Sequence, residues 1–280
     1  MTTVSPRETH RGPASGPAAV RFPLWLYLPA GIAVAVLVLP LAALLLRLDW
    51  AQVPAAITSP AAIQALTLSL VTAALATATC VLLGVPLALV IARSSRGVAA
   101  ILRTLATLPL VLPPLVGGIA LLALLGRSGL VGGALSLAGI RIPFTTTAVV
   151  IAQTFVALPF LVIAVEGSLR SVGTRYETVS AGLGAGRFTT FRRVTLPLVA
   201  PGLLAGTVLC FARALGEFGA TALFAGNAAG TTRTMPLAIY TAFNGAGVSE
   251  DIAIALSLML ILVAVGVLLL MRSWREDAPR

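Results

Sequence analysis

Ser168–Pro197 reads SLRSVGTRYETVSAGLGAGRFTTFRRVTLP, a charged, glycine-containing stretch between two long apolar runs. The apolar runs, residues 145–165 and 199–224, are each long enough to cross a bilayer, which takes about 20 residues. A polar loop of this size between two spans is a place where another molecule can dock. The loop is rich in basic side chains, namely Arg170, Arg175, Arg187, Arg192 and Arg193.

The composition places the chain in a membrane, because 58% of its residues are hydrophobic and only 10% are charged. The apolar runs do not alternate with polar residues and only 6% of the residues are aromatic, which disfavours a transmembrane barrel. We therefore predict an all-α polytopic membrane protein with six transmembrane helices. The predicted spans are Leu24–Leu46, Ile63–Ala92, Leu105–Leu125, Thr145–Val165, Val199–Phe224 and Ile252–Met271.

The predicted domain organisation is a single transmembrane domain between two tails. Residues 1–22 are rich in Pro, Gly, Ser and Thr and are predicted to form a disordered tail. The transmembrane domain is expected over residues 23–272, with the charged loop at about 169–197 between the fourth and fifth spans. Residues 273–280 are expected to form a C-terminal tail.

The net charge of +10 is carried by arginine, which supplies all 19 basic residues. If the N-terminus is cytoplasmic, fourteen arginines fall in cytoplasmic segments and only four in external ones. This asymmetry follows the positive-inside rule, so both termini and the charged loop are predicted to be cytoplasmic in a multi-pass cell-membrane protein. The charge is then a property of topology and does not indicate a nucleic-acid partner.

The residues needed for enzyme chemistry are scarce. The one histidine, His10, lies in the N-terminal tail, so neither a Ser-His-Asp triad nor a metal site is expected. Without lysine the chain cannot form a Walker A loop, so any ATP and Mg²⁺ must bind to a separate chain. We expect no catalytic residue and no cofactor in this chain. Cys80 and Cys210 fall inside apolar spans and are interpreted as small core residues.

The charged loop contains a helix-start pattern. Thr174 and Glu177 have the spacing of a capping box, which predicts a short helix from Arg175 to about Leu183. A glycine in the left-handed conformation, Gly184 or Gly186, would end this helix. An alternative is that the loop is a basic amphipathic segment lying on anionic headgroups.

The residue order of this loop resembles the cytoplasmic coupling loop of ABC-type permeases fed by a binding protein. Glu177, Gly184, Val194 and the exit Leu196-Pro197 match the family pattern, while Val179 and Ser180 replace its two alanines. The resemblance implies a helix that seats in a groove of a cytosolic ABC ATPase dimer. It implies the following coupling residues: Thr174, Tyr176, Glu177, Leu183, Gly184, Ala185, Leu196 and Pro197.

A second group of residues lies in the predicted fifth span. Arg213 and Glu217 are spaced i, i+4, so they share a helix face and can pair at a depth where ionisable groups are costly. The pair is either a static scaffold or part of a gate.

The segment ALGEFGAT, residues 214–221, followed by TRTMPL at residues 232–237, resembles the molybdate branch of oxyanion permeases. This resemblance implies an importer for molybdate, or for tungstate with the same geometry. It also implies an extracytoplasmic molybdate-binding protein and a second copy of the chain in a homodimer. The alternatives are a sulfate or thiosulfate permease of the same class and an ATP-independent secondary carrier, for which Glu217 is the candidate coupling carboxylate.

A similar sequence pattern occurs in the predicted third span and at the entry to the predicted fifth span. Residues 108–118, LPLVLPPLVGG, share seven of eleven positions with residues 196–206, LPLVAPGLLAG, through either duplication or convergence on one helix-entry pattern. Proline removes a backbone hydrogen bond from a membrane-spanning helix, and this is tolerated where neighbouring helices or a cavity satisfy the freed carbonyl group. We therefore expect the third helix to lie beside the fifth, around the translocation path. The candidates for path or gate are Pro113, Pro114, Gly117, Gly118, Arg213, Gly216, Glu217, Gly219 and Thr221.

Overall fold

The computed structural model describes residues 23–245 and 250–276, and these residues form helices joined by turns and loops, with no strand among them. The all-helical prediction is thus confirmed over the described ranges. The predicted tail 1–22 lies outside the described residues. At the other end α13, Glu250–Glu276, includes the first residues of the predicted tail 273–280, and residues 277–280 are not described.

Contacts divide the chain into two units, residues 1–47 and 48–280. The described part of the first unit is a 3-10 turn, η1 at Leu24–Leu26, followed by α1 at Tyr27–Leu46. Helix α1 is long and apolar enough to cross a membrane.

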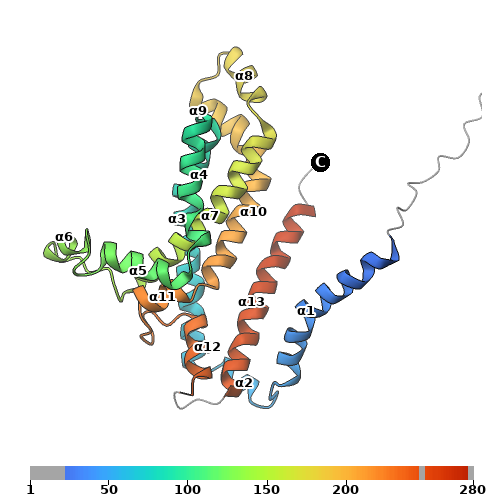
Figure 1. Cartoon of the computed structure of the whole chain (residues 1–280), viewed down its shortest axis with the longest axis vertical. Coiled ribbons are helices and arrows are strands. Elements are labelled where there is room, and N and C mark those ends of the chain that lie inside the picture. Colours follow the sequence, from blue (N-terminus) through green and yellow to red (C-terminus); the bar gives the residue numbers. More distant parts are fainter. Residues whose placement is uncertain (1–22, 246–249, 277–280) are drawn as a thin grey trace, which may run out of the picture. The chain divides into compact units, whose positions relative to one another are not determined.

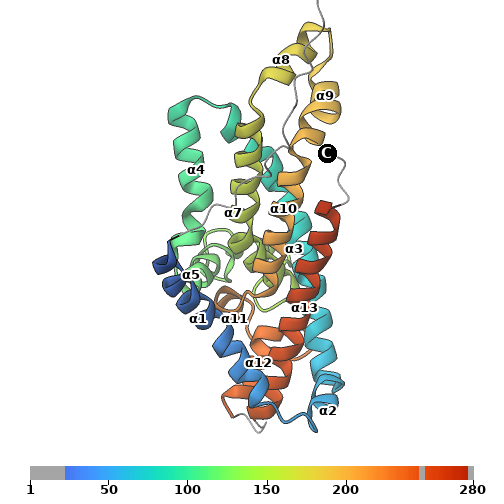
Figure 2. The same ribbon diagram turned by 90° about the vertical axis from the view of Figure 1, so that its right-hand side faces the viewer.

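The centre of the second unit is a bundle of three long helices, α3 (Pro60–Arg93), α7 (Thr146–Val172) and α10 (Leu196–Leu215) (Figures 1 and 2). Two of them begin at hydroxyl caps. Ser59 Oγ accepts from the N–H of Ala62 at 3.3 Å, and Thr145 Oγ1 accepts from the N–H of Ala148 at 3.2 Å.

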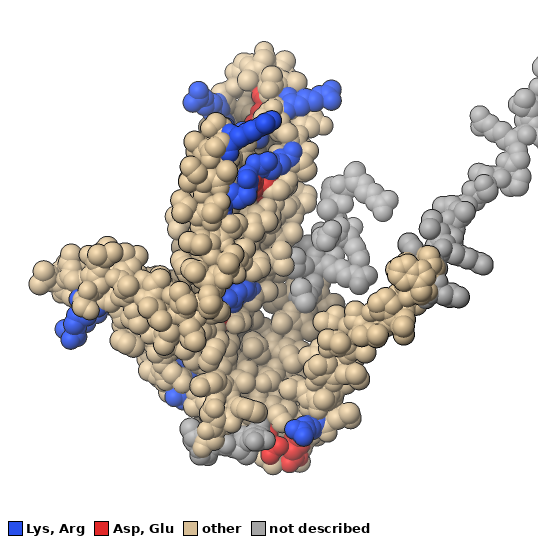
Figure 3. Space-filling model, viewed as in Figure 1, with Lys and Arg blue, Asp and Glu red and all other residues tan. Residues whose placement is uncertain are grey.

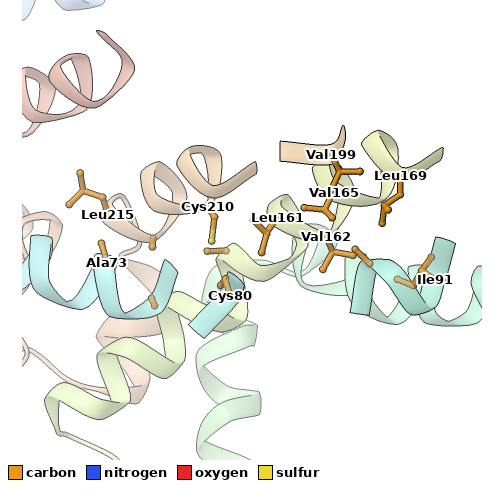
Figure 4. Close-up of a cluster of buried hydrophobic side chains, with 14 of the residues drawn as sticks. Ala73, Cys80, Ile91, Leu161, Val162, Val165, Leu169, Val199, Cys210 and Leu215 are labelled. Carbon is orange, nitrogen blue, oxygen red and sulfur yellow. The ribbon is translucent and has the colours of Figure 1, made fainter. Parts of the chain in front are cut away.

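Small residues allow these three helices to approach closely, which is the usual way that membrane helices pack. A Cβ at Gly84 of α3 would lie 2.9 Å from Leu161 Cδ2 of α7. A Cβ at Gly206 of α10 would lie 2.8 Å from the Cβ of Ala164, also in α7. Figure 4 shows Cys80 and Cys210 in this core, where both are buried free thiols, in agreement with their interpretation as small core residues.

The predicted third span is broken into two helices, α4 (Arg96–Val111) and α5 (Pro114–Leu125), which meet at a bend of 114°. The prediction of one continuous helix over Leu105–Leu125 is therefore wrong. Proline explains the break, because it lacks an N–H and forces the preceding residue out of the helical region. Leu112, before Pro113, is accordingly extended, with φ −69° and ψ 134°.

The predicted fifth span, Val199–Phe224, is also shorter than expected. Helix α10 ends at Leu215, and a separate short helix, α11, begins at Gly219 and ends at Phe224. The chain between them changes direction at residues 216–218, so the prediction of a single helix to Phe224 is wrong. The second unit also contains α2 (Val53–Ile57), α6 (Gly132–Leu137), α12 (Met235–Phe243) and α13, together with the short helices of the loop between α7 and α10.

Four helical segments in the described residues have the length and apolarity of a membrane span. They are α1, α3, α7 and the continuous helical run Arg187–Leu215. The bent pair of α4 and α5 makes a fifth if it is counted as one span, and Asp251–Val267 of α13 is a shorter apolar stretch. The protein is thus a multi-pass membrane protein with four or five candidate spans.

Candidate coupling loop and buried ion pair

The loop between α7 and α10 contains the predicted short helix, α8, at Arg175–Gly182. Gly184 follows it with φ of 82°, a left-handed conformation that glycine adopts without strain. The N–H of Gly184 donates to the carbonyl of Ala181 at 2.9 Å, and that of Ala185 donates to Ser180 at 3.1 Å. These two bonds form a Schellman cap, so the predicted end of the helix at Gly184 is confirmed.

Glu177 connects α8 to two other elements. Arg93, at the end of α3, donates from Nε to Oε2 at 3.1 Å and from Nη2 to Oε1 at 2.7 Å. Thr195, just before α10, donates from Oγ1 to Oε1 at 2.9 Å.

The predicted capping box is wrong, since Thr174 has a helical backbone and makes no side-chain capping bond within the described chain. A bidentate guanidinium is a stronger partner for a carboxylate than a backbone N–H.

The protonation of Glu177 follows from these partners. Burial raises the pKa of its carboxyl, but the hydrogen bonds from Arg93 and Thr195 and the charge of Arg93 outweigh this effect. The pKa of Glu177 is consequently lowered below its ordinary value. The carboxylate is therefore charged at neutral pH, and the attachment of α8 to α3 is intact there.

Part of the exposed surface of α8 is formed by apolar side chains. Tyr176 is 53% exposed, Val179 is 57% exposed and Leu183 at the C-cap is 84% exposed. Their spacing of three and four residues places them on one helix face. Phe188 of the following helix α9, Arg187–Thr190, is also exposed. Large apolar side chains on an otherwise polar, well-anchored helix form a surface suited to docking in a groove.

A π-helical turn, η2 at Phe191–Thr195, joins α9 to α10. In this turn the N–H of Leu196 donates to the carbonyl of Phe191, five residues back. The following residue is Pro197, whose ring clashes with a carbonyl four residues back in a regular α-helix. A wider turn just before the proline relieves that clash. The predicted exit Leu196-Pro197 thus continues directly into α10, next to the Thr195 contact with α8.

Arg213 and Glu217 form the predicted ion pair, with Nη2 of Arg213 2.7 Å from Oε2 of Glu217. The side chain of Glu217 is 1% exposed and that of Arg213 is 27% exposed. The two residues do not share one helix, because α10 ends between them. The second carboxylate oxygen, Oε1, accepts from the N–H of Ala220 at 2.9 Å, in the first turn of α11. Glu217 therefore fixes the start of α11 to the end of α10.

Two of the glycines predicted to line a path, Gly118 and Gly219, lie where α5 packs against α11. A Cβ at Gly118 would lie 3.0 Å from both the carbonyl oxygen of Ala220 and the Cβ of Leu223. A Cβ at Gly219 would lie 2.8 Å from the Cβ of Pro114. The expectation that the third span lies beside the fifth is thus met at α5 and α11.

The remaining predicted path residues have other neighbours. Gly117 faces α7, where its Cβ would lie 3.1 Å from Phe155 Cε1. Pro113 is the residue before the first turn of α5, and Gly216 is the C-cap of α10 with an ordinary φ of −86°.

Several polar side chains in the second unit are buried without a hydrogen-bond partner among the described residues. They are Thr221 and Thr234, through Oγ1, and Gln153, through both amide atoms. A buried polar atom without a partner is costly and often marks a place for water or a ligand. Thr221 was among the predicted path residues, whereas Gln153 and Thr234 were not among the predicted site residues. A glutamine in the middle of an apolar run was the available signal for Gln153.

A second buried carboxylate, Glu166 of α7, was also missed. Its side chain is 6% exposed and pairs with Arg103 at 2.6 Å and with Arg170 at 2.7 Å. The signal was a carboxylate at the end of an apolar run with an arginine four residues later. Over the described ranges, no group of three His, Cys, Asp or Glu residues could hold a metal ion.

The fold and this loop define a class of protein: a multi-pass, all-helical membrane protein with a small helix between two of its spans. Residues 84–275 match the family described as binding-protein-dependent transport system inner membrane component, and the chain belongs to that family.

Individual relatives show which members of this family the chain resembles. The chain is 56% identical over 218 residues to the "Molybdenum transport system permease protein ModB" of Mycobacterium tuberculosis, covering 78% of this chain and 83% of the relative. It is 42% identical over 179 residues to the protein of the same name in Escherichia coli K12, covering 64% and 78%. A solved bacterial ABC transporter involved in alginate import superposes with a TM-score of 0.72 at 20% identity, covering 91% of this chain and 95% of that one. This last likeness concerns the fold alone.

Proposed function

We propose that this chain is the transmembrane permease subunit of an ATP-binding-cassette importer for molybdate, with tungstate as a further cargo of the same geometry. A separate cytosolic ATPase dimer binds ATP and Mg²⁺, and an extracytoplasmic binding protein delivers the anion. Two copies of the chain, each with six spans, form the path between them. Transport proceeds by alternating access, in which the ATPases drive a reorientation of the helices.

The observation that carries this proposal is the way α8 is held. Glu177 joins it to Arg93 at the end of α3 and to Thr195 at the start of α10. An apolar row on its outer face is free to enter a groove on a partner. A force applied to α8 is therefore transmitted to two long helices of the bundle. These features support its role as the coupling helix between the fourth and fifth spans.

The distribution of charge supports the orientation. Basic side chains gather at the end of the second unit that carries α8 and α9 (Figure 3). Loops on the cytoplasmic side of membrane proteins carry an excess of arginine and lysine. This end is assigned to the cytoplasm, and the distribution of arginine along the sequence supports the same side for both termini.

The cargo assignment is supported by the relatives and by sequence. The permeases named above are molybdenum transporters by name, and the one from Mycobacterium tuberculosis is 56% identical to this chain. The segment at residues 214–221 contains Glu217 and Gly219, which shape the start of α11 next to α5. We place the translocation path beside this contact.

Uptake in cells that lack their own molybdate permease tests the cargo. The chain is expressed with its ATPase and binding protein, and accumulated molybdenum is measured by mass spectrometry at submicromolar molybdate. Tungstate in tenfold excess is expected to suppress uptake strongly, and sulfate in the same excess to suppress it little. Stronger suppression by sulfate would favour the sulfate permease alternative. Uptake that persists without the ATPase would favour a secondary carrier.

A further inference from the structure

A cavity of about 530 Å³ lies between the ends of α3, α4 and α7, outside the contact of α5 with α11. Its lining comes from the last residues of α3, the first turns of α4, the last turn of α7 and the segment that joins α7 to α8. The cavity is strongly basic. Its polar lining residues are Arg93, Ser94, Arg96, Arg103, Arg170 and Thr174.

The positive charge of this cavity exceeds the negative charge that its arginines contact. Glu177 pairs with Arg93, and Glu166 is shared between Arg103 and Arg170. Arg96 has no ion-pair partner in the described part of the chain. Four guanidinium groups thus face two carboxylates, which leaves an excess of two positive charges.

The start of α4 adds backbone donors to the same cavity. Ser95, the N-cap residue, makes no side-chain capping bond to the described residues, and the N–H of Ala99 is bonded to the carbonyl of Ser95. The N–H groups before Ala99 therefore have no partner within the helix. Ser94, Arg96 and Ala99 line the cavity, so the positive end of the α4 dipole lies at its wall. Such a helix start favours an anion.

We propose that this cavity is a binding site for a tetrahedral oxyanion, a chemistry shared by inorganic dianions and by the phosphate of an anionic lipid headgroup. The excess charge of two matches a dianion, and Arg96 offers donors that no carboxylate occupies. The volume leaves room for bridging waters or for the glycerol part of a headgroup. The proposal rests on the proposed function only for placing the site at the cytoplasmic face.

The site has a consequence for α8. An anion held by Arg93, Arg96 and Arg170 connects the α3–α4 turn to the end of α7. Arg93 is also the partner of Glu177, so the anion and the coupling helix share one guanidinium. Occupation of the cavity therefore acts on the attachment of α8 and not on the path beside α11.

The first test measures inorganic sulfate and phosphate binding by equilibrium dialysis to the full-length chain in phosphatidylcholine nanodiscs. The test variant is R96Q/R170Q, in which Glu166 keeps Arg103 and no carboxylate loses its only partner. The control is R175Q, which removes one exposed charge at the start of α8 outside the cavity lining. R96Q/R170Q is expected to weaken sulfate binding tenfold or more, and R175Q less than about twofold.

The second arm identifies a lipid occupant. The same proteins are equilibrated with phosphatidylglycerol, and retained lipid is counted by native mass spectrometry. Selective retention by wild type and R175Q, lost in R96Q/R170Q, supports the site with a headgroup phosphate as its occupant. R96Q alone, which breaks no ion pair, gives the same comparison if the double variant does not fold. Equal anion binding and equal lipid retention by wild type and these variants would overturn the proposal.

These outcomes are separate from the cargo. Because the probes are sulfate, phosphate and a phospholipid, a chain that failed to import molybdate would still give a result at this cavity. Normal molybdate import by the wild-type chain, with sulfate binding and lipid retention unchanged in R96Q/R170Q, would contradict the site and leave the proposed function intact.

Discussion

At the scale of single residues, two carboxylates hold the functional elements together. Glu177 ties α8 to the bundle through Arg93 and Thr195, and Glu217 ties α11 to α10 through Arg213 and the N–H of Ala220. Each carboxylate does so with two partners from different elements. The loss of either is expected to affect movement between elements more than the helices themselves.

The attachment of α8 predicts that Glu177→Lys uncouples the complex, because a lysine repels Arg93 where the carboxylate attracts it. The permease should still insert, while substrate-stimulated ATP hydrolysis by the purified complex should fall at least tenfold. Glu177→Gln, which keeps an acceptor for Thr195, should lower this ATP hydrolysis less.

Gly184→Val should resemble Glu177→Lys, since a β-branched residue at φ of 82° is strained. Wild-type coupling in both Glu177→Lys and Gly184→Val would favour the alternative of a loop on the headgroups.

The lowered pKa of Glu177 gives this contact a defined pH dependence. A carboxyl with a depressed pKa contributes stability above its unfolded pKa, near 4.3, and loses it as the pH falls through the folded value. Coupling through α8 should therefore be constant from pH 6 to 8. Hydrogen exchange of the α8 amides, measured relative to the intrinsic exchange rate at each pH, should increase only below about pH 4.3 in wild type. In Glu177→Gln this acid-induced increase should be absent, and a similar increase in both proteins would contradict the role of Glu177.

The Arg213–Glu217 pair predicts that substitutions of its two members lower thermal stability by different amounts. Arg213→Gln leaves Glu217 buried without its counter-ion, a change that costs about 3–5 kcal/mol for a buried pair. Glu217→Gln removes the charge but keeps an oxygen for the N–H of Ala220, so Arg213→Gln should lower thermal stability more. The double variant R213Q/E217Q should be more stable than R213Q alone. Wild-type stability and transport in all three variants would show that the pair is neither scaffold nor gate.

At the scale of elements, α5 and α11 depend on close approach at glycine. Gly118→Val would place atoms within contact distance of the backbone of α11, and overpacking of this kind typically costs about 1–3 kcal/mol. Gly167→Val on α7 is a matched control, since a Cβ there meets nothing within 4 Å. The melting temperature in detergent is expected to fall for Gly118→Val and to change little for Gly167→Val. Equal melting temperatures would mean that α11 moves aside without cost.

Features that depend on residues nearby in the sequence were predictable from the sequence. Contacts between residues far apart in the sequence were not. The end of α8 at Gly184 and the weakness at Pro113 depend on neighbouring residues only. The partner of Glu177 is Arg93, 84 residues away, and no local pattern specifies it. The same holds for Glu166 with Arg103. The break at residues 216–218 was missed because Glu217 was assumed to continue a helix, whereas its carboxylate caps the next one.

At the scale of the whole molecule, the proposed function is that of a permease whose helices reorient when a partner subunit hydrolyses ATP. The chain belongs to the family of binding-protein-dependent inner membrane components, and its proposed partners are an ATPase dimer, a binding protein and a second copy of itself. The contact between α8 and α3 connects the loop that we propose binds the ATPase to the bundle, and the contact between α5 and α11 lies beside the proposed path.

The central claim is tested most directly by molybdate uptake into proteoliposomes that contain the purified permease, its ATPase and its binding protein. The account predicts uptake with hydrolysable ATP and none with a non-hydrolysable analogue. It also predicts that Gly184→Val retains the assembled permease in the bilayer but loses ATP-driven uptake. Molybdate uptake of equal rate without ATP, or without the ATPase subunit, would contradict the account.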